Sequence, residues 1–217
     1  MNLISRLYNT KFIQNCLAVR RKKRVEFILS KVKVFDNMSI LDVGCGIDGR
    51  SFENFIPDNY NIIGIDIRPK NKVTIKHPGF KYLQINATDL NIFKDKQFDL
   101  CVSIGMIEHV CNPNTLEIIA HEIDRVSKQY VVIVPWKYSW IEPHYKIPFF
   151  ALLPYSLKLL LIRVFNLNNQ REFVKSNPNY LRNNTQWLSN KQYKKIFPGS
   201  KCYLTNTLET VAIIKKE

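Results

Sequence analysis

Three glycines at the spacing G-x-G-x-x-G mark the part of the sequence best suited to bind a ligand. Gly44, Gly46 and Gly49 follow the apolar run Ser39–Val43, an order that predicts a strand, a tight loop and a helix. Glycine is needed where the backbone turns sharply and approaches a ligand without a Cβ in the way. Asp42, two residues before the first glycine, would repel a pyrophosphate, whereas its carboxylate suits a ligand that carries positive charge.

An acid near the end of the next apolar run fits the same kind of ligand. Asp66 lies at the end of the run Asn61–Ile67, where a carboxylate can accept hydrogen bonds from both hydroxyls of a ribose. The glycines and Asp66 suit a dinucleotide as well as other nucleotide-like cofactors. Asp42 is therefore the residue that favours a cationic cofactor over a dinucleotide.

Four further residues could accept or orient a proton close to this loop. Glu108 and His109 follow the fourth predicted strand, and Glu142 and His144, separated by one proline, follow the fifth. Imidazole titrates near neutral pH, and a neighbouring carboxylate can hold it in place. We therefore take these four as candidate catalytic residues. Packing of the two histidines is the alternative interpretation.

Apolar runs that alternate with helical patterns indicate the fold class. Strands are expected at Ser39–Val43, Asn61–Ile67, Phe80–Ile85, Phe98–Ser103 and Tyr130–Val134. A helix is expected to begin at Asn112-Pro113, with asparagine as the N-cap and proline at the first helical position. Lys201–Lys215 predicts two more strands joined by a turn near Asn206. This order predicts an α/β fold with a doubly wound seven-stranded sheet, mostly parallel with an antiparallel C-terminal hairpin, and helices on both faces.

Helical patterns lie at both ends of the chain, and an insertion precedes the last one. Residues 1–34 predict a helical lead-in, and Ser189–Phe197 predicts a capped helix that Pro198-Gly199 ends. The segment 136–188 is rich in aromatic residues and prolines, and we expect it to cover the active site as an insertion or lid. Within it, Trp136 and Tyr145 are candidates for contact with a substrate.

Composition limits the classes of protein that remain. The chain has 217 residues, 46% of them hydrophobic, which predicts one domain over residues 1–217. Its five cysteines show no metal-ligand spacing, and no signal-peptide pattern is visible, so a cytoplasmic setting is expected. The net charge of +14 would attract polyanions. Residues 149–165 could form an apolar helix that contacts a membrane surface, although two prolines and two cations within 147–165 make this stretch a poor spanning helix.

Five segments in the same order resemble a known family, the class I S-adenosylmethionine-dependent methyltransferases, in particular the type 11-like branch. Residues 40–46 (ILDVGCG) are similar to the first motif of this family, and residues 63–66 (IGID) to the second. The other three similar segments are the adenine loop at 86–90, the fourth strand and its exit at 98–110, and a late helix at 187–199. The resemblance covers about residues 35 to 215 and implies a Rossmann-like sheet that binds S-adenosylmethionine.

The resemblance also implies which residues bind this cofactor. They are Asp42, Gly44, Cys45, Gly46, Asp66, Ile67, Asn86, Ala87, Asp89 and Ser103. The family usually has an acid where this chain has Asn86, so either the Asn86 side-chain oxygen or Asp89 would bind the adenine amino group. In relatives that methylate quinone precursors, a divalent ion is held by an extra acid three residues before the glutamate. That position is Gly105 here, so no metal is expected.

The expected function is methyl transfer to a hydroxyl or amine of a small molecule, such as a sugar or a lipid-linked intermediate. An RNA methyltransferase is the alternative that the basic charge favours, and nucleic acid is the less expected partner because no RNA-binding domain or base-methylation motif is visible. A module that only binds the cofactor is a third alternative. The intact motif residues Asp42, Gly44, Gly46 and Asp66 argue against it.

Overall fold

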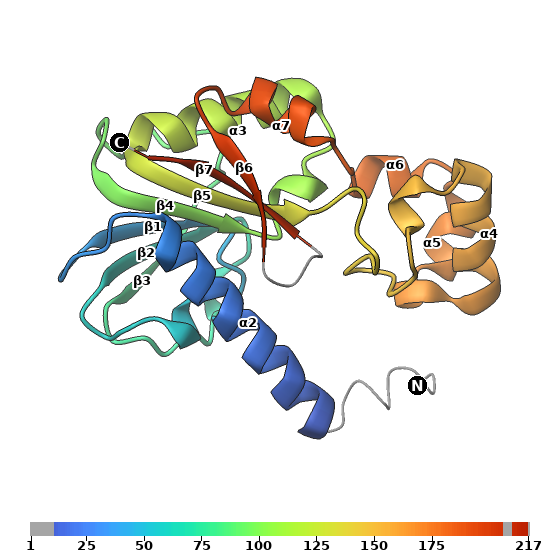
Figure 1. The fold of residues 1–217 in the computed structure, drawn as a ribbon, viewed down its shortest axis with the longest axis horizontal. Helices are drawn as coiled ribbons and strands as arrows, with labels where there is room; N and C mark the ends of the chain where they lie inside the picture. Colours follow the sequence, from blue (N-terminus) through green and yellow to red (C-terminus); the bar gives the residue numbers. More distant parts are fainter. Residues whose placement is uncertain (1–10, 206–209, 217) are drawn as a thin grey trace.

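The computed structural model describes residues 11–205 and 210–216, without the side chains of residues 11–14. Seven strands form one sheet in the spatial order β3-β2-β1-β4-β5-β7-β6 (Figure 1). Their bounds are β1 Ser39–Val43, β2 Asn61–Asp66, β3 Phe80–Gln84, β4 Phe98–Ile104, β5 Ser127–Pro135, β6 Lys201–Leu204 and β7 Thr210–Lys215. All seven strands expected from the sequence are present.

The pairing of the strands confirms the predicted fold class. Strands β1 to β5 pair in parallel, whereas β7 runs antiparallel to β5 and β6 antiparallel to β7. The turn expected near Asn206 lies outside the described residues. The chain adds strands to one side of β1 and then to the other, so the strand order reverses between β1 and β4. In open sheets of this kind, ligands bind beyond the carboxyl ends of the strands at such a reversal.

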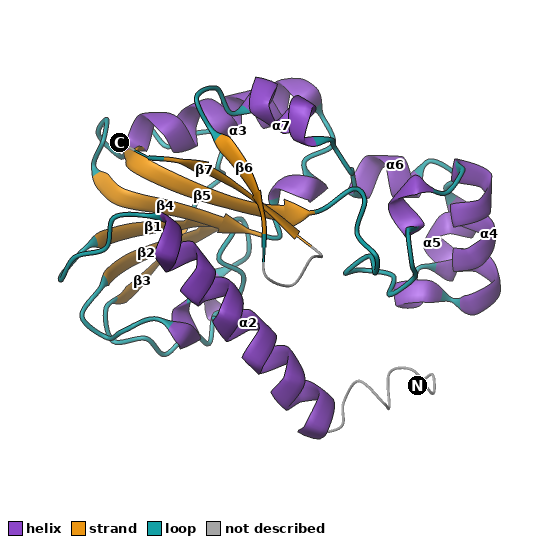
Figure 2. Cartoon of the chain, in the orientation of Figure 1, coloured by secondary structure: helices purple, strands orange, loops and turns teal. Residues whose placement is uncertain are grey.

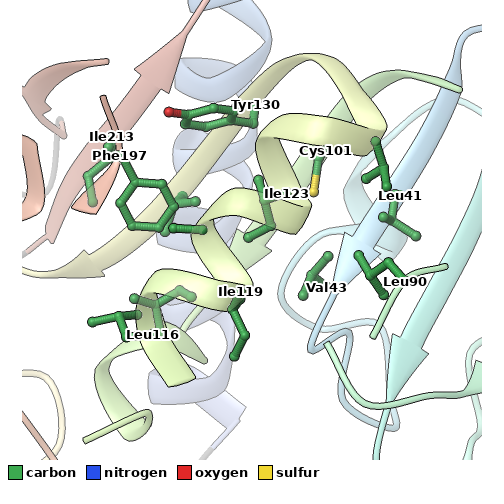
Figure 3. Packing of buried hydrophobic residues seen from close by; sticks show 14 of the residues in the cluster. Leu41, Val43, Leu90, Cys101, Leu116, Ile119, Ile123, Tyr130, Phe197 and Ile213 are labelled. Atoms are coloured by element: carbon green, nitrogen blue, oxygen red, sulfur yellow. The ribbon is translucent and has the colours of Figure 1, made fainter. Parts of the chain in front are cut away.

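Alternating side chains of the strands build a separate apolar cluster on each face of the sheet. In β1, Leu41 and Val43 belong to the cluster that α3 (Pro113–Val126) and α7 (Asn190–Ile196) cover. Figure 3 shows part of this cluster, with side chains of α3 lying between β1 and Phe197. The intervening residues of the strands pack instead against α2 (Lys11–Lys31) on the opposite face. Both faces of the central strands are therefore buried, as their almost continuous apolar sequence predicts.

Two of the helices begin at the caps that the sequence predicts. Asn112 is the N-cap of α3, and its side chain accepts a hydrogen bond from Thr115 N at 3.2 Å. Ser189 caps α7 in a reciprocal arrangement with Gln192, the third residue of that helix. Within the expected lead-in over residues 1–34, Lys11–Lys31 form α2, and residues 1–10 lie outside the described residues. Figure 2 shows these helices on the two faces of the sheet.

The helix expected directly after the glycine loop is not formed. Only one 3-10 turn, η1 (Glu53–Phe55), follows β1, and another, η2 (Lys70–Lys72), lies between β2 and β3. Phe52 has a non-helical backbone, with φ −145°, and its ring is fully buried in the cluster under α2. The segment between Gly49 and Pro57 has only seven residues, and proline cannot continue a helix. The segment is therefore too short to propagate a helix.

The insertion forms a group of short helices with its own small apolar cluster. Its elements are η4 Phe150–Leu152, α4 Tyr155–Phe165, η5 Leu167–Asn169, α5 Arg171–Ser176 and α6 Tyr180–Asn184. Their shared cluster includes Tyr145, Phe150 and Ile162. Figure 1 shows this group beyond the arrowheads of β4 and β5. A lid role for the insertion stays a prediction.

Helix α4 is shorter than the apolar helix expected over 149–165, because Pro154 ends η4 and α4 begins after it. Its outer face leaves large apolar side chains exposed, among them Leu157, Leu160 and Val164. Among the described residues, no helix combines the length and the apolar character needed to cross a membrane. Contact of this segment with a membrane surface stays a prediction.

Candidate active site

A pocket of about 400 Å³ opens where the carboxyl ends of β1 to β4 meet. This volume lies in the range of small-molecule sites. Its walls come from the glycine loop, the end of β2, the loop after β3 and the exit of β4. They are formed by Gly44, Ile65, Asp66, Ile67, Arg68, Ile85, Asn86, Ala87, Gly105, Met106, His109 and Val110. The pocket therefore lies at the strand-order reversal, where the fold predicts a ligand.

Glycine at position 44 is required by two features of the loop. Its φ is +76°, in the region that side chains disfavour, and a Cβ there would lie 2.6 Å from Met106 Cγ. The Gly44 N–H donates to Ile65 O at 2.8 Å, which ties the loop to the end of β2. The backbone thus passes close under Met106 and leaves the pocket wall at this point without a side chain.

Asp66 is held in place by backbone donors. Its Oδ2 accepts from Gly46 N at 3.1 Å, and its Oδ1 accepts from Arg68 N at 3.0 Å. Arg68 also forms an ion pair with Oδ2 at 3.3 Å. Each carboxylate oxygen retains lone-pair capacity. Asp66 can therefore accept hydrogen bonds from a diol in the pocket while its orientation is fixed.

Asp42 and Glu53 form a buried acid pair below the glycine loop. Both are about 1% exposed, and among the described residues no donor reaches Asp42 Oδ2 or either carboxylate oxygen of Glu53. Burial raises the pKa of Asp42 well above its ordinary value, and the charge of Glu53 raises it further. Burial also raises the pKa of Glu53. A proton shared between the two carboxyl groups is the arrangement that satisfies these atoms.

Glu142 and His144 form a carboxylate–imidazole pair in the loop after β5. His144 Nδ1 lies 2.7 Å from Glu142 Oε1, and the other oxygen of Glu142 accepts the backbone N–H groups of His144 and Tyr145 at 2.6 and 2.7 Å. Trp187 Nε1 donates to Oε1 at 3.2 Å. Burial alone would raise the pKa of Glu142, but these hydrogen bonds and the His144 charge lower it. Burial likewise opposes the charged imidazole, yet the bond to Glu142 raises the pKa of His144.

His144 also approaches the residues that follow β4. Glu108 and His109 belong to the 3-10 turn η3 (Ile107–His109), and His144 Nε2 lies 3.9 Å from Glu108 Oε1. The rings of His109 and His144 meet edge to face with centroids 5.3 Å apart. Burial raises the pKa of Glu108, which is 2% exposed. Glu108, His109 and His144 each offer one ligand atom within 4.8 Å of the others, so this cluster could hold a metal ion. Because His109 lines the pocket, the cluster borders it.

Comparison with known proteins supplies the family. Residues 41–134 match a family model described as a methyltransferase domain. This match and the relatives described below support a class I S-adenosylmethionine-dependent methyltransferase.

Relatives with known names are distant. A ubiquinone biosynthesis O-methyltransferase from Rickettsia prowazekii is 28% identical over 142 residues, which are 54% of this chain and 56% of that protein. The homologous protein of Rickettsia bellii is 28% identical over 119 residues, 51% of this chain and 48% of that one. This chain thus matches about half the length of these relatives.

A solved methyltransferase shares the fold across nearly the whole chain. The S-adenosylmethionine-dependent methyltransferase of Archaeoglobus fulgidus superposes with a TM-score of 0.60 at 15% identity and covers 92% of this chain and 94% of that one. At this identity, the likeness describes the fold alone. The methyltransferase match ends at residue 134, so the insertion lies outside it.

The residues proposed from the sequence to bind the methyl donor fall into two groups in this methyltransferase. Those that line the pocket are Gly44, Asp66, Ile67, Asn86 and Ala87. Those outside the lining are Asp42, Cys45, Gly46, Asp89 and Ser103. Gly46 nevertheless contributes its N–H to Asp66, and the buried Ser103 hydroxyl donates to Val43 O at 2.9 Å. Of the two candidates for the adenine amino group, Asn86 is therefore the one at the pocket.

Contact of Asp42 with the cofactor, as the sequence interpretation has it, stays a prediction. That interpretation placed it against a cationic cofactor tail, whereas it is buried beside Glu53, away from the pocket lining. Glu53 belongs to the 3-10 turn η1, which forms in place of the expected helix.

The two residues proposed for substrate contact lie in aromatic packing rather than in the pocket wall. Tyr145 is 4% exposed, stacks on Phe150 with ring centroids 4.2 Å apart, and donates from its hydroxyl to Gln170 Oε1 at 2.7 Å. Trp136 meets Tyr138 at 5.9 Å in a T-shaped pair. Substrate contact by either residue stays a prediction.

Sequence reasoning missed three residues that shape the site. Arg68 pairs with Asp66, Met106 covers Gly44, and Trp187 donates to Glu142. Arg68 could have been found from its place two residues after an acid at a strand end. The other two depend on the path of loops and have no signal in the sequence.

Proposed function

We propose that this methyltransferase transfers the methyl group of S-adenosylmethionine to a hydroxyl oxygen of a small molecule. The observation that carries the proposal is one pocket with Asp66 and Asn86 on one side and the Glu108, His109 and His144 cluster at its border. Asp66 and Asn86 follow β2 and β3, on one side of β1, where they suit a nucleoside, whereas Glu108 and His109 follow β4, on the other side of β1. The relatives named ubiquinone biosynthesis O-methyltransferase favour an oxygen acceptor over an amine.

The pocket fits the cofactor by its chemistry. The Asp66 carboxylate is anchored by backbone N–H groups and suits a ribose diol, and the wall at Gly44 has no Cβ because Met106 leaves no room for one. Asn86 and Ala87 would border the adenine. When bound, S-adenosylmethionine supplies a methyl carbon activated by its positive sulfur. The chain then has to align the acceptor, exclude water and remove the hydroxyl proton.

The cluster at the pocket border is suited to that last task. Glu142 is anchored by two backbone N–H groups and Trp187, and it fixes the ring of His144. Because the ring of His144 is already held in one orientation, little side-chain entropy is lost when it meets an acceptor. Glu108, His109 and His144 are therefore the proposed catalytic residues, and Glu142 is a positioning residue that acts through His144.

The RNA alternative rests on the net charge of +14 and on Tyr and Phe residues scattered among Lys and Arg. A phosphate-binding site would lose affinity steeply as salt rises, whereas a neutral acceptor would not respond in this way. All five cysteines are free thiols, which is consistent with the proposed cytoplasmic setting.

The test measures acceptor-dependent formation of S-adenosylhomocysteine. Purified chain is incubated with S-adenosylmethionine and, in separate reactions, a monophenol, a catechol, a sugar, an aromatic amine and total RNA. We expect product with at least one hydroxyl compound and a rate insensitive to moderate salt. Turnover with the amine alone or with RNA alone would overturn the proposal, and so would cofactor binding without turnover on any of the hydroxyl compounds.

A further inference from the structure

Three metal-binding side chains from two distant loops meet at the border of the pocket. Glu108 and His109 come from the turn after β4, and His144 comes from the loop after β5. One ligand atom from each lies within 4.8 Å of the other two. In a tetrahedral zinc site the ligand atoms are about 3.4 Å apart, given bonds of about 2.1 Å. Contraction by up to about 1.4 Å at the longest separation would complete such a site.

Both imidazoles are oriented as metal-bound imidazoles are. His144 Nδ1 faces Glu142 Oε1 at 2.7 Å, and His109 Nδ1 faces the backbone oxygen of Asn184 at 2.7 Å. An ionised carboxylate and a carbonyl can only accept, so each Nδ1 carries a hydrogen, and Nε2 is the ring atom that can coordinate a metal ion. Histidine ligands usually donate their second N–H to a carboxylate or a backbone carbonyl in this way. The two rings are thus set for coordination through Nε2.

Glu108 supplies the third ligand and needs a cation. It is 2% exposed, and its Oε2 has no hydrogen-bond partner among the described residues. A buried carboxylate without a partner is costly, whereas a bound cation would compensate its charge. Gly105 itself offers no side chain toward Glu108, and a Cβ there would lie 3.8 Å from Glu108 Oε1.

We propose that Glu108, His109 and His144 bind a divalent transition-metal ion at the border of the methyl-donor pocket. Two imidazoles and one carboxylate suit Zn²⁺ and its neighbours in the first row, whereas Mg²⁺ and Ca²⁺ prefer sites made of oxygen atoms. The expectation of no metal rested on Gly105, and this ligand set replaces the missing acid with His144. With a metal bound, the Nε2 atoms of His109 and His144 would no longer accept a proton, and the ion would instead lower the pKa of an acceptor hydroxyl that ligates it. The proposal goes beyond methyl transfer, since metal binding can be measured without cofactor or acceptor.

Calorimetric titration of the metal-free chain with ZnCl₂, and separately with MgCl₂, tests the proposal. We expect one Zn²⁺ per chain and no comparable heat from Mg²⁺. The His144→Ala and His109→Ala variants should each weaken Zn²⁺ binding at least about 10-fold, and Glu142→Gln should weaken it about 10- to 100-fold through the orientation of His144. His121→Ala, which changes an exposed histidine on α3, is the matched control and should bind as the wild type does.

Absorption of the Co²⁺-loaded chain gives a second readout that does not depend on the stability of the alanine variants. We expect visible bands of a low-coordinate Co²⁺ site in the wild type and a shifted or lost spectrum in Glu108→Gln, which keeps the size of the side chain. No stoichiometric Zn²⁺ in the wild type, or equal affinity in His144→Ala and His121→Ala, would overturn the proposal. Neither result would touch the cofactor pocket, whose test is S-adenosylmethionine binding.

Discussion

The buried pair of Asp42 and Glu53 should make the stability of the folded chain depend on pH. Both pKa values are raised by burial, so the folded chain holds a proton on the pair at pH values where the unfolded carboxyls, which titrate at about pH 4, hold none. The substitution Glu53→Gln removes one of the two titrating groups. It keeps the size of the side chain and supplies an amide donor for the Asp42 carboxylate.

The sign and size follow from proton linkage. In this range the folded state binds more protons than the unfolded state, so the free energy of unfolding falls as pH rises, by about 1.4 kcal/mol per pH unit for one proton. The loss begins above the unfolded pKa and ends when pH passes the folded pKa of the pair. In Glu53→Gln the free energy of unfolding should fall less with pH, by up to this amount per pH unit. The stability of the variant relative to the wild type should therefore rise with pH.

Urea unfolding at several pH values between about 5 and 8 measures the difference. Glu117→Gln, at an exposed acid on α3, is the control and should shift the wild-type curve without changing its slope. Parallel pH profiles for Glu53→Gln and the wild type would refute the shared proton. A variant that loses stability with rising pH faster than the wild type would refute it as well.

Three further substitutions test how the fold supports the site. Asn112→Ala removes the N-cap of α3 and should lower the free energy of unfolding by about 1 kcal/mol in urea titrations, and no change would show that the cap is not used. Gly64→Ala would place a Cβ 2.4 Å from Phe80 Cε2 and should cost about 1–3 kcal/mol in the same assay; an unchanged midpoint would contradict this packing. Arg125 donates to Leu90 O at 3.1 Å at the end of the adenine loop, so Arg125→Lys should weaken S-adenosylmethionine binding roughly 10-fold by calorimetry, and equal affinity would exclude this role.

The sheet could be predicted from the sequence because its signals are local. Apolar runs bounded by turns located all seven strands, and Asn112-Pro113 and Ser189 located two helix starts from cap chemistry alone. The prediction of a helix after the glycine loop was wrong. Apolar spacing did not reveal that the buried, non-helical Phe52 and the nearby Pro57 would leave only a 3-10 turn. Local patterns thus gave the order of the elements better than their lengths.

The site was predictable only where its residues lie at strand ends. Asp66 and Asn86 were found because their strands deliver them to the sheet edge, which sequence position determines. The approach of His144 to Glu108 and the pairing of Asp42 with Glu53 depend on the paths of two loops. No periodic pattern encodes such paths, so these contacts and the metal ligand set were not foreseen.

Binding of S-adenosylmethionine tests the central claim most directly. Calorimetry should find one cofactor per wild-type chain and an affinity reduced about 100-fold in Asp66→Ala, since two hydrogen bonds to a charged group would be lost. Asp58→Ala removes the same charge at an exposed position in the turn before β2 and should bind as the wild type does. Equal affinity in Asp66→Ala and Asp58→Ala, or no binding by the wild type, would contradict the assignment of this pocket to the methyl donor.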